Sequence, residues 1–457
     1  GRCTRFQADQ VPAMPILPRL VIASVSEHEE PSTCTVAIMA TLQNRGYHVQ
    51  HFRSLAAFTP IDYVTPLTGI ASRHLDPWIM SAPLCRELFA RSAAHVDLSV
   101  IEGNLSVPVD TSADGGSGGW RDVAKSLNAP VIGVIRSQST GLFHAKALPP
   151  GIDALFIDGF SSREQYEAEK TTVEGIYGLP VLGGLAAGNL AAECIEKMRQ
   201  ARRIPGAMIA ELARQVLEVT DLQRVLKLAH GRPFPNQTAD FFSTGFSPRS
   251  LRVAIAYDDC FHCYFPDTLD ALEFLGAELS EFSPLVDERL PHGTDIVYLG
   301  CGHPHHHART LADNECMRAA LREHVCSGRR VYAEGGGTAY LCKQLRLVDD
   351  SVFPMVGVFA AEAKFTGRPL ARPVPVTLTC ERANWIAGAG DTVRGYRNGA
   401  WQLGPGRGLT PCFSSDAPDP ECVVRHHCVG STVHLNFAAQ PRVLEAFFAP
   451  HAPSLSL

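Results

Sequence analysis

The stretch that decides the fold is residues 330–341, which read RVYAEGGGTAYL. Arg330–Ala333 is expected to form a strand, and three successive glycines, Gly335–Gly337, follow it closely. Moving outward, apolar strand candidates lie at residues 251–257, 277–282 and 295–299, with helical patterns at 267–275 and 314–327 between them. Strands that alternate with helices predict an α/β domain, followed here by a strand-rich tail from about Pro354.

The first half of the chain shows the same alternation. Its strand candidates are residues 20–23, 47–52, 96–101, 129–135, 154–157 and 180–185. A helix is expected over 33–45, and a long amphipathic helix over 191–227 with Pro205 interrupting it. The pattern predicts a parallel sheet with helices on both faces. We therefore divide the chain into four parts: an arm or leader (1–13), a first domain (14–235), a linker (236–250) and a second domain (251–457).

Composition narrows the class of protein. Of the 457 residues, 45% are hydrophobic and 19% charged, as in ordinary globular domains. A net charge of -6 without a basic cluster argues against nucleic-acid binding, and the lack of an apolar run of about 20 residues argues against a membrane span. The polar start has no secretory pattern and the 14 cysteines are too few for a disulfide scaffold, so we expect a cytoplasmic protein.

Segments from residue 19 to about 445 resemble a known family. They are RLVIAS (19–24), YVTPLTGIASRHLDPWIM (63–80), VIEGNL (100–105), FSPLVDERLP (282–291), YLGCGHP (298–304) and GSTVHLNFAAQP (430–441). Their order and spacing are similar to the cobyrinic acid a,c-diamide synthase family of two-domain glutamine amidotransferases, which convert tetrapyrrole carboxylates to amides. The resemblance implies a P-loop-NTPase-like (dethiobiotin-synthetase-like) domain, then a class I glutamine-amidotransferase-like α/β domain.

The chain departs from the family at the phosphate-binding loop. The family's first strand leads into a G-x-x-x-x-G-K-S/T loop, in which backbone N–H groups and a Lys hold the phosphates. Here residues 24–33 read SVSEHEEPST, with Pro31 in place of the Lys and three glutamates where phosphates would lie. The first domain is therefore expected to be degenerate, without an ATP–Mg²⁺ site. Glu102 is retained and Asp110 lies near the family's second acidic position, so these carboxylates and Arg53 are candidate ligand-binding residues, or ordinary solvated loop residues.

A second departure removes the nucleophile. In class I glutamine amidotransferases a Cys at a strand-to-helix elbow is activated by a His from a later strand. Gly335 stands at the position of that Cys, and His434 matches the His, so we expect a vestigial His434 held by packing and no catalytic residue of the usual kind. Cys301, in the loop after strand 295–299, is the one candidate thiol to replace the missing nucleophile.

Histidine and cysteine gather in three loops of the second domain. Two of the loops follow strands directly, so they should meet at the carboxyl edge of the sheet. Imidazole and thiolate groups that converge there suit zinc, copper, nickel or an iron or cobalt tetrapyrrole. The candidate metal ligands are Cys260, His262, Cys263, His305, His426 and His427, and Cys301 and His303 are candidate ligand-binding residues. The alternative is a His-rich surface segment without a metal.

Three functional hypotheses follow. The first is a catalytically degenerate relative that binds a tetrapyrrole or a metal-containing ligand between its domains, or that serves as partner of a tetrapyrrole or corrinoid enzyme. The second is a working enzyme with an altered site, either an amide-forming ligase or a metal-dependent enzyme. The third is a structural subunit, as a homodimer or as a heterodimer with an active paralogue.

Overall fold

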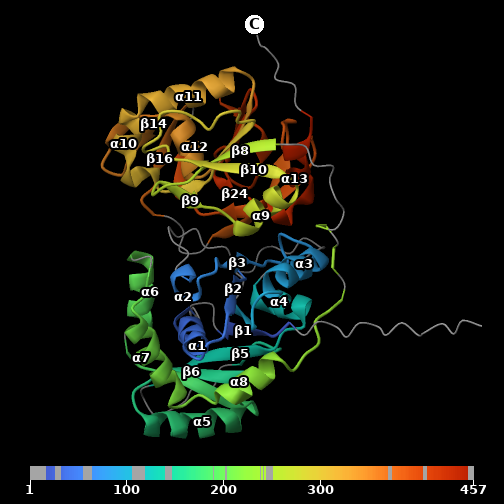
Figure 1. The fold of residues 1–457 in the computed structure, drawn as a ribbon, viewed down its shortest axis with the longest axis vertical. Helices are drawn as coiled ribbons and strands as arrows, with labels where there is room; N and C mark the ends of the chain where they lie inside the picture. Colours follow the sequence, from blue (N-terminus) through green and yellow to red (C-terminus); the bar gives the residue numbers. More distant parts are fainter. Residues whose placement is uncertain are drawn as a thin grey trace, which may run out of the picture.

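The structure is a computed structural model with two α/β halves (Figure 1). It describes residues 17–25, 32–54, 64–104, 119–138, 147–188, 190–200, 203–236, 238–239, 241–242, 251–368, 373–404 and 409–450. Each half is built around a seven-stranded sheet, as the strand and helix alternation predicts. The α/β fold class is therefore confirmed, whereas the boundaries of the four parts of the chain stay a prediction.

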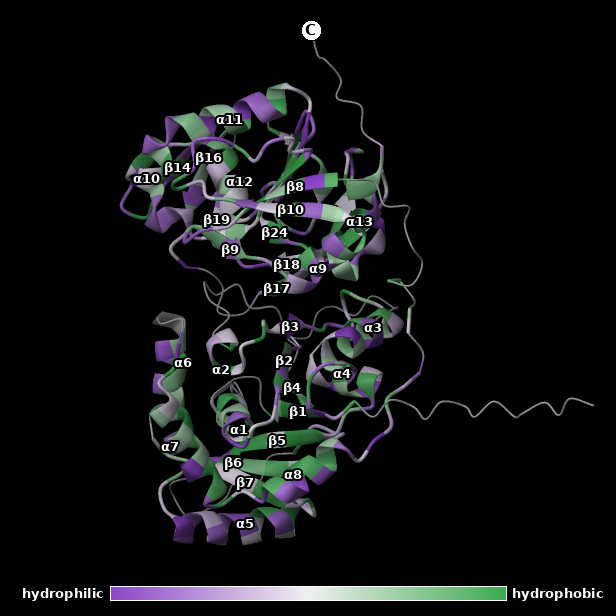
Figure 2. Ribbon diagram, in the orientation of Figure 1, coloured by the Kyte–Doolittle hydropathy of each residue, from purple (hydrophilic) through white to green (hydrophobic). Residues whose placement is uncertain are grey.

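The sheet of the first half is parallel throughout and has the order β3-β2-β4-β1-β5-β6-β7. Its strands are β1 (Arg19–Ser24), β2 (Val49–Arg53), β3 (Arg73–His74), β4 (Leu98–Gly103), β5 (Val131–Arg136), β6 (Ala154–Phe160) and β7 (Val181–Ala186). Apolar runs such as VIGVIR in β5 are buried because helices cover both faces of a parallel sheet. Figure 2 shows β5 and β6 in hydrophobic colours, whereas α5 at the margin carries hydrophilic ones.

The helices of this half are α1 (Ser32–Asn44), α2 (Thr65–Thr68), α3 (Ala82–Ala93), α4 (Trp120–Leu127), α5 (Arg163–Tyr177), α6 (Leu190–Gln200), α7 (Gly206–Leu217) and α8 (Leu222–Ala229). The predicted long helix over 191–227 is wrong as a single element. Pro205 precedes α7, as expected, but a second break separates α7 from α8. Asp221 causes it, because its side chain accepts from the Arg224 N–H as a helix cap while its own N–H donates to the Leu182 carbonyl in β7.

The main sheet of the second half has the order β10-β8-β11-β13-β23-β22-β20, with the first five strands parallel. Its strands are β8 (Leu251–Ala256), β10 (Ala277–Phe282), β11 (Ile296–Leu299), β13 (Arg330–Glu334), β20 (Thr410–Pro411), β22 (Cys422–Arg425) and β23 (Cys428–Ser431). The helical elements are α9 (Pro266–Phe274), α10 (Ala308–Asp313), α11 (Glu315–Cys326), α12 (Gly336–Leu341), α13 (Pro441–Phe448) and the 3₁₀ turns η1 (Pro304–His306) and η2 (Phe437–Ala439).

Three small sheets complete this half. They consist of β9 (Phe261–Cys263) with β12 (Cys301–Gly302); of β14 (Cys342–Arg346), β15 (Val352–Pro354), β16 (Phe359–Phe365) and β19 (Trp401–Leu403); and of β17 (Val374–Cys380), β18 (Thr392–Arg397), β21 (Phe413–Ser414) and β24 (Val433–His434). The strand-rich tail after Pro354 is thus confirmed. In the ribbon, β9, β17, β18 and α9 lie on the side of this half that faces the first half (Figures 1 and 2).

Both apolar and polar contacts join the halves. One buried cluster contains Phe52 and Phe89 from the first half together with Phe265 and Tyr298 from the second. Arg73 of β3 forms ion pairs with Asp267 and Asp270 of α9, at 3.0 and 2.5 Å. Among the helices within the described ranges, none combines the length and hydropathy that crossing a bilayer requires.

Candidate functional site

The glycine elbow lies between β13 and α12. Gly335 has φ +47° and ψ -113°, a left-handed conformation that glycine adopts without the strain of a Cβ. Its N–H donates to the Ser431 carbonyl of β23, which fixes the turn against the neighbouring strand. A Cβ built at this position would lie 2.7 Å from Cε1 of His434 and 3.4 Å from Sγ of Cys301. The imidazole and the thiol therefore occupy the space into which a side chain at position 335 would point.

His434 is fully buried between a thiol and a carboxylate. Its Nε2 lies 3.7 Å from Sγ of Cys301, and its Nδ1 lies 3.8 Å from a Glu334 carboxylate oxygen. The other Glu334 oxygen accepts hydrogen bonds from the Tyr332 hydroxyl and the Leu435 N–H. The order thiol, imidazole, carboxylate is the one that activates nucleophiles in hydrolases, with the thiol here contributed by the loop after β11 rather than by the elbow.

Cys301 and Cys263 face each other across the antiparallel pair β9 and β12. The hydrogen bond between their thiols and burial both raise the pKa of Cys301 well above its ordinary value. The same hydrogen bond, followed by interactions with His262 and His303, holds the pKa of Cys263 well below it.

Of the predicted metal ligands, the structure brings His262 and Cys263 together, and His303, predicted as a ligand-binding residue, completes the cluster. Each residue offers one ligand atom, and the three atoms lie within 4.8 Å of one another. His262 and Cys263 come from β9, and His303 follows β12, so the antiparallel pairing places them side by side. His303 is thus a member of the cluster, and Cys301, also predicted as a ligand-binding residue, lies beside it.

The other predicted metal ligands are not in the cluster. The Cys260 thiol is buried in apolar core, which raises its pKa, and its carbonyl accepts from the His303 N–H. His305 stacks on Phe365 with ring centroids 3.7 Å apart, and burial lowers the pKa of His305 to about 3.

His426 and His427 join β22 to β23 at the amino end of β23, whereas Glu334 and the elbow lie at the carboxyl end of the parallel strand β13. His427 contacts the Gly328 carbonyl there. The structure therefore places both histidines at the opposite edge of the sheet from the cluster, and the predicted six-residue metal set does not form one site.

In the first half, Glu102 ends β4 beside the start of α1. Its buried carboxylate accepts from the Ser32 hydroxyl at 3.0 Å and lies 3.7 Å from Nε2 of His51. Arg53 pairs with Glu102 in the parallel register of β2 and β4, so both lie at the carboxyl edge of the sheet. Asp110 and residues 26–31 of the altered phosphate-binding loop lie outside the described residues.

Sequence reasoning missed a buried polar network between the halves. The Tyr396 hydroxyl of β18 contacts Nε2 of His74 at 2.8 Å and donates to Asp76, while Asn436, two residues after His434, lies 3.3 Å from Nδ1 of His74. Burial lowers the pKa of His74 to about 3 and raises that of Asp76 to about 6. The only signal in the sequence was the family-like segment 63–80 that contains both residues.

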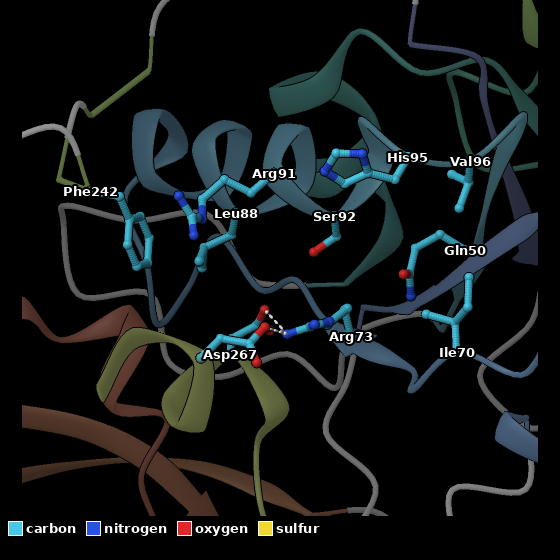
Figure 3. A pocket seen from close by; sticks show the side chains of 11 residues that line it. Gln50, Ile70, Arg73, Leu88, Arg91, Ser92, His95, Val96, Phe242 and Asp267 are labelled. Atoms are coloured by element: carbon cyan, nitrogen blue, oxygen red, sulfur yellow. Dashed lines mark hydrogen bonds and ion pairs between the residues drawn. The ribbon is translucent and has the colours of Figure 1, made fainter. Parts of the chain in front are cut away.

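A cavity of about 320 Å³ lies beside this network, between α3 and α9 (Figure 3). Its walls carry cationic and acidic groups as well as apolar ones, namely Gln50, Ile70, Arg73, Leu88, Arg91, Ser92, His95, Val96, Phe242, Asp267 and Asp270. Arg73 points across it toward Asp267, and Arg91 lies over the ring of Phe242 at 4.2 Å. The cavity therefore offers guanidinium groups at the junction of the two halves.

The chain is similar to glutamine amidotransferases and to cobyrinate a,c-diamide synthases. Residues 252–441 match a CobB/CobQ-like glutamine amidotransferase domain. Cobyrinate a,c-diamide synthase of Syntrophotalea carbinolica is 29% identical over 94% of this chain and 98% of its own length. The enzymes of the same name from Methanosphaera stadtmanae and Listeria innocua are each 30% identical, over 77% and 81% of this chain and 79% and 85% of their own.

Two similar solved structures each cover less than half of this chain. PurLQS from Thermotoga maritima covers 44% of this chain and 98% of its own, with 12% identity and a TM-score of 0.34. A glutamine amidotransferase structure covers 43% and 99%, with 19% identity and a TM-score of 0.33.

Proposed function

The chain belongs to the cobyrinate a,c-diamide synthase family, and we propose that within it this protein binds a carboxylate-bearing tetrapyrrole between its halves without hydrolysing glutamine. The observation that carries the proposal is the elbow. Glutamine hydrolysis of the usual kind needs a thiolate at the residue after the strand, and Gly335 supplies no side chain there. The space is filled by His434 instead, so glutamine has no nucleophile at that point.

The ligand is inferred from the relatives and from charge. The relatives are named for cobyrinate, a corrinoid that carries several carboxylates. Arg91 lines the cavity at the junction and lies over the Phe242 ring, whereas Arg73 in the same wall is already paired with Asp267 and Asp270. Arg394 of β18 lies over the Trp78 ring and donates to its carbonyl. Guanidinium groups hold carboxylates through charge-assisted pairs of hydrogen bonds. A cavity of about 320 Å³ suits one carboxylate-bearing arm of such a ligand, with the ring outside it.

The test measures hydrolysis and binding separately. We expect no release of glutamate from glutamine by this chain under conditions in which the Listeria innocua relative turns over. We also expect cobyrinate to bind, measured by calorimetry, and the Arg91→Gln variant, which leaves the pairs of Arg73 with Asp267 and Asp270 intact, to bind at least tenfold more weakly. Arg214→Gln, an exposed arginine of α7, is the matched control and should bind as the unaltered chain does. Glutamate release at the relative's rate, or cobyrinate binding that is absent, would overturn the proposal.

One observation favours a second candidate, a glutaminase with a transposed nucleophile. Sγ of Cys301 lies within reach of His434, 3.4 Å from the point where a Cβ of residue 335 would lie. If Cys301 acts, the glutamine analogue 6-diazo-5-oxo-L-norleucine should alkylate it, and Cys301→Ser should lose both the label and any glutamate release. Because the pKa of Cys301 is raised, we expect peptide mass spectrometry to find no such adduct at pH 7.

A further inference from the structure

We propose that His262, Cys263 and His303 form a zinc site at the carboxyl edge of the second sheet, beside the glycine elbow. The proposal goes beyond tetrapyrrole binding and does not depend on it. Two imidazoles and one thiolate are ligands that zinc prefers, and three protein ligands with one open position are typical of zinc sites that bind a water molecule or a substrate. The three candidate ligand atoms lie within 4.8 Å of one another, so small side-chain movements would bring them onto a common ion.

The ring nitrogens are arranged as those of metal ligands are. Nδ1 of His262 lies 3.1 Å from the Asp258 carbonyl oxygen and can only donate to it, so the lone pair of the neutral ring is on Nε2. A ligand histidine is commonly oriented by such a hydrogen bond from its other nitrogen to a backbone carbonyl. Nε2 of His262 and Nδ1 of His303 are both buried, and beyond the interactions of the two rings with the Cys263 thiol neither atom has a hydrogen-bond partner among the described residues. A cation bound between the two rings and the sulfur would satisfy all three groups.

The surrounding loop is held rigidly. The Asp258 carboxylate accepts from the N–H groups of Cys260 and Phe261 on one oxygen, and from the Ser283 hydroxyl and the Leu285 N–H on the other. The His303 N–H donates to the Cys260 carbonyl at 2.7 Å. These bonds fix the backbones of both ligand-bearing segments, so the ligands are preorganised by groups that do not themselves bind the ion.

Cys301 lies next to the open position of the proposed site. Its thiol meets the Cys263 sulfur across β9 and β12 and contacts His434 on its other side. A zinc ion at the cluster would therefore lie near His434 and the glycine elbow, with Cys301 between them.

The test uses the full chain and zinc alone. After incubation with Zn²⁺ and gel filtration, we expect about one zinc per chain by elemental analysis. Co²⁺ in place of zinc should give a thiolate-to-cobalt charge-transfer band in the near ultraviolet. His262→Ala, Cys263→Ser and His303→Ala should each weaken zinc binding at least a hundredfold, and Cys263→Ser should also lose the charge-transfer band. Circular dichroism and the melting temperature establish that each variant is folded.

Two controls match the chemistry of the ligands. His426→Asn removes an imidazole at the opposite edge of the sheet, where φ +53° suits asparagine, and Cys316→Ser removes an exposed thiol. Both should bind zinc as the unaltered chain does. Failure of the folded chain to retain zinc, or retention by folded Cys263→Ser, would overturn the site. Glutamate release and cobyrinate binding are measured on chelator-treated protein, so their outcome is separate from that of the zinc measurement.

Discussion

Replacing Gly302 with alanine should lower the free energy of unfolding by about 3 kcal/mol, the upper end of the cost of overpacking. A Cβ at this position would lie 2.9 Å from both the carbonyl carbon of Cys260 and the Cα of Phe261, and would overlap the Cys260 carbonyl oxygen. These are backbone atoms, so no rotamer change relieves the contact. The segment that contains Cys260 and Phe261 cannot move away, because both side chains are buried in the apolar core.

The measurement is urea denaturation followed by circular dichroism. Gly175→Ala is the matched control, because it adds the same methyl group near the end of α5, where nothing lies within 4 Å. That change should raise the free energy of unfolding by about 0.5 kcal/mol, since alanine loses less backbone entropy than glycine in a helix. Equal stabilities for the two variants would contradict the packing of β9 against β12.

The fold could be predicted because burial in a parallel sheet leaves apolar runs. Strands such as β5 and β8 stand out in the sequence for this reason, and Pro205 marks a helix start by its missing N–H. The break at Asp221 was missed because it depends on a hydrogen bond to Leu182, 39 positions earlier in the chain. The hydrophobic pattern of neighbouring residues contains no information about a contact between residues so far apart.

The candidate site could be predicted only in part. The loops after β8 and β11 were placed at one edge because parallel strands share their carboxyl ends. In the sequence, the loop with His426 and His427 looks like the other two His- and Cys-containing loops. However, β22 runs antiparallel to β23, so the turn that joins these two strands lies at the other edge of the sheet. Cys301 lies close to Cys263 because β9 pairs with β12. These strands have only three and two residues, too few to produce a recognisable sequence pattern.

Removing either His74 or Asp76 should change the pH dependence of stability, in opposite directions. Burial raises the pKa of Asp76 to about 6 from 3.8, so the folded state binds the proton more tightly. The stability that Asp76 contributes is present below pH 3.8 and is lost as pH rises through 6. Burial lowers the pKa of His74 to about 3 from 6.5, so its contribution is present above pH 6.5 and is lost as pH falls toward 3.

Between pH 4 and 6 the two contributions oppose each other. One pKa unit corresponds to about 1.4 kcal/mol, and both groups are partly titrated at the edges of this window, so each residue contributes about 2 kcal/mol over it, and in the unaltered chain the two nearly cancel. Relative to that chain, Asp76→Asn should lose about 2 kcal/mol as pH falls from 6 to 4, and His74→Gln should gain about as much. The double variant should track the unaltered chain apart from a constant offset.

Urea unfolding at pH 4, 5 and 6 measures these differences, and every other titrating group cancels because each variant is compared with the unaltered chain at the same pH. Tyr396→Phe is the informative control, because it removes the hydroxyl that joins the two side chains while leaving both titratable groups in place. It should lower stability and leave the opposing slopes present. Stability curves for Asp76→Asn and His74→Gln that run parallel to that of the unaltered chain would mean that neither group is buried at the junction. In that case the two halves would not meet there as the structure has them.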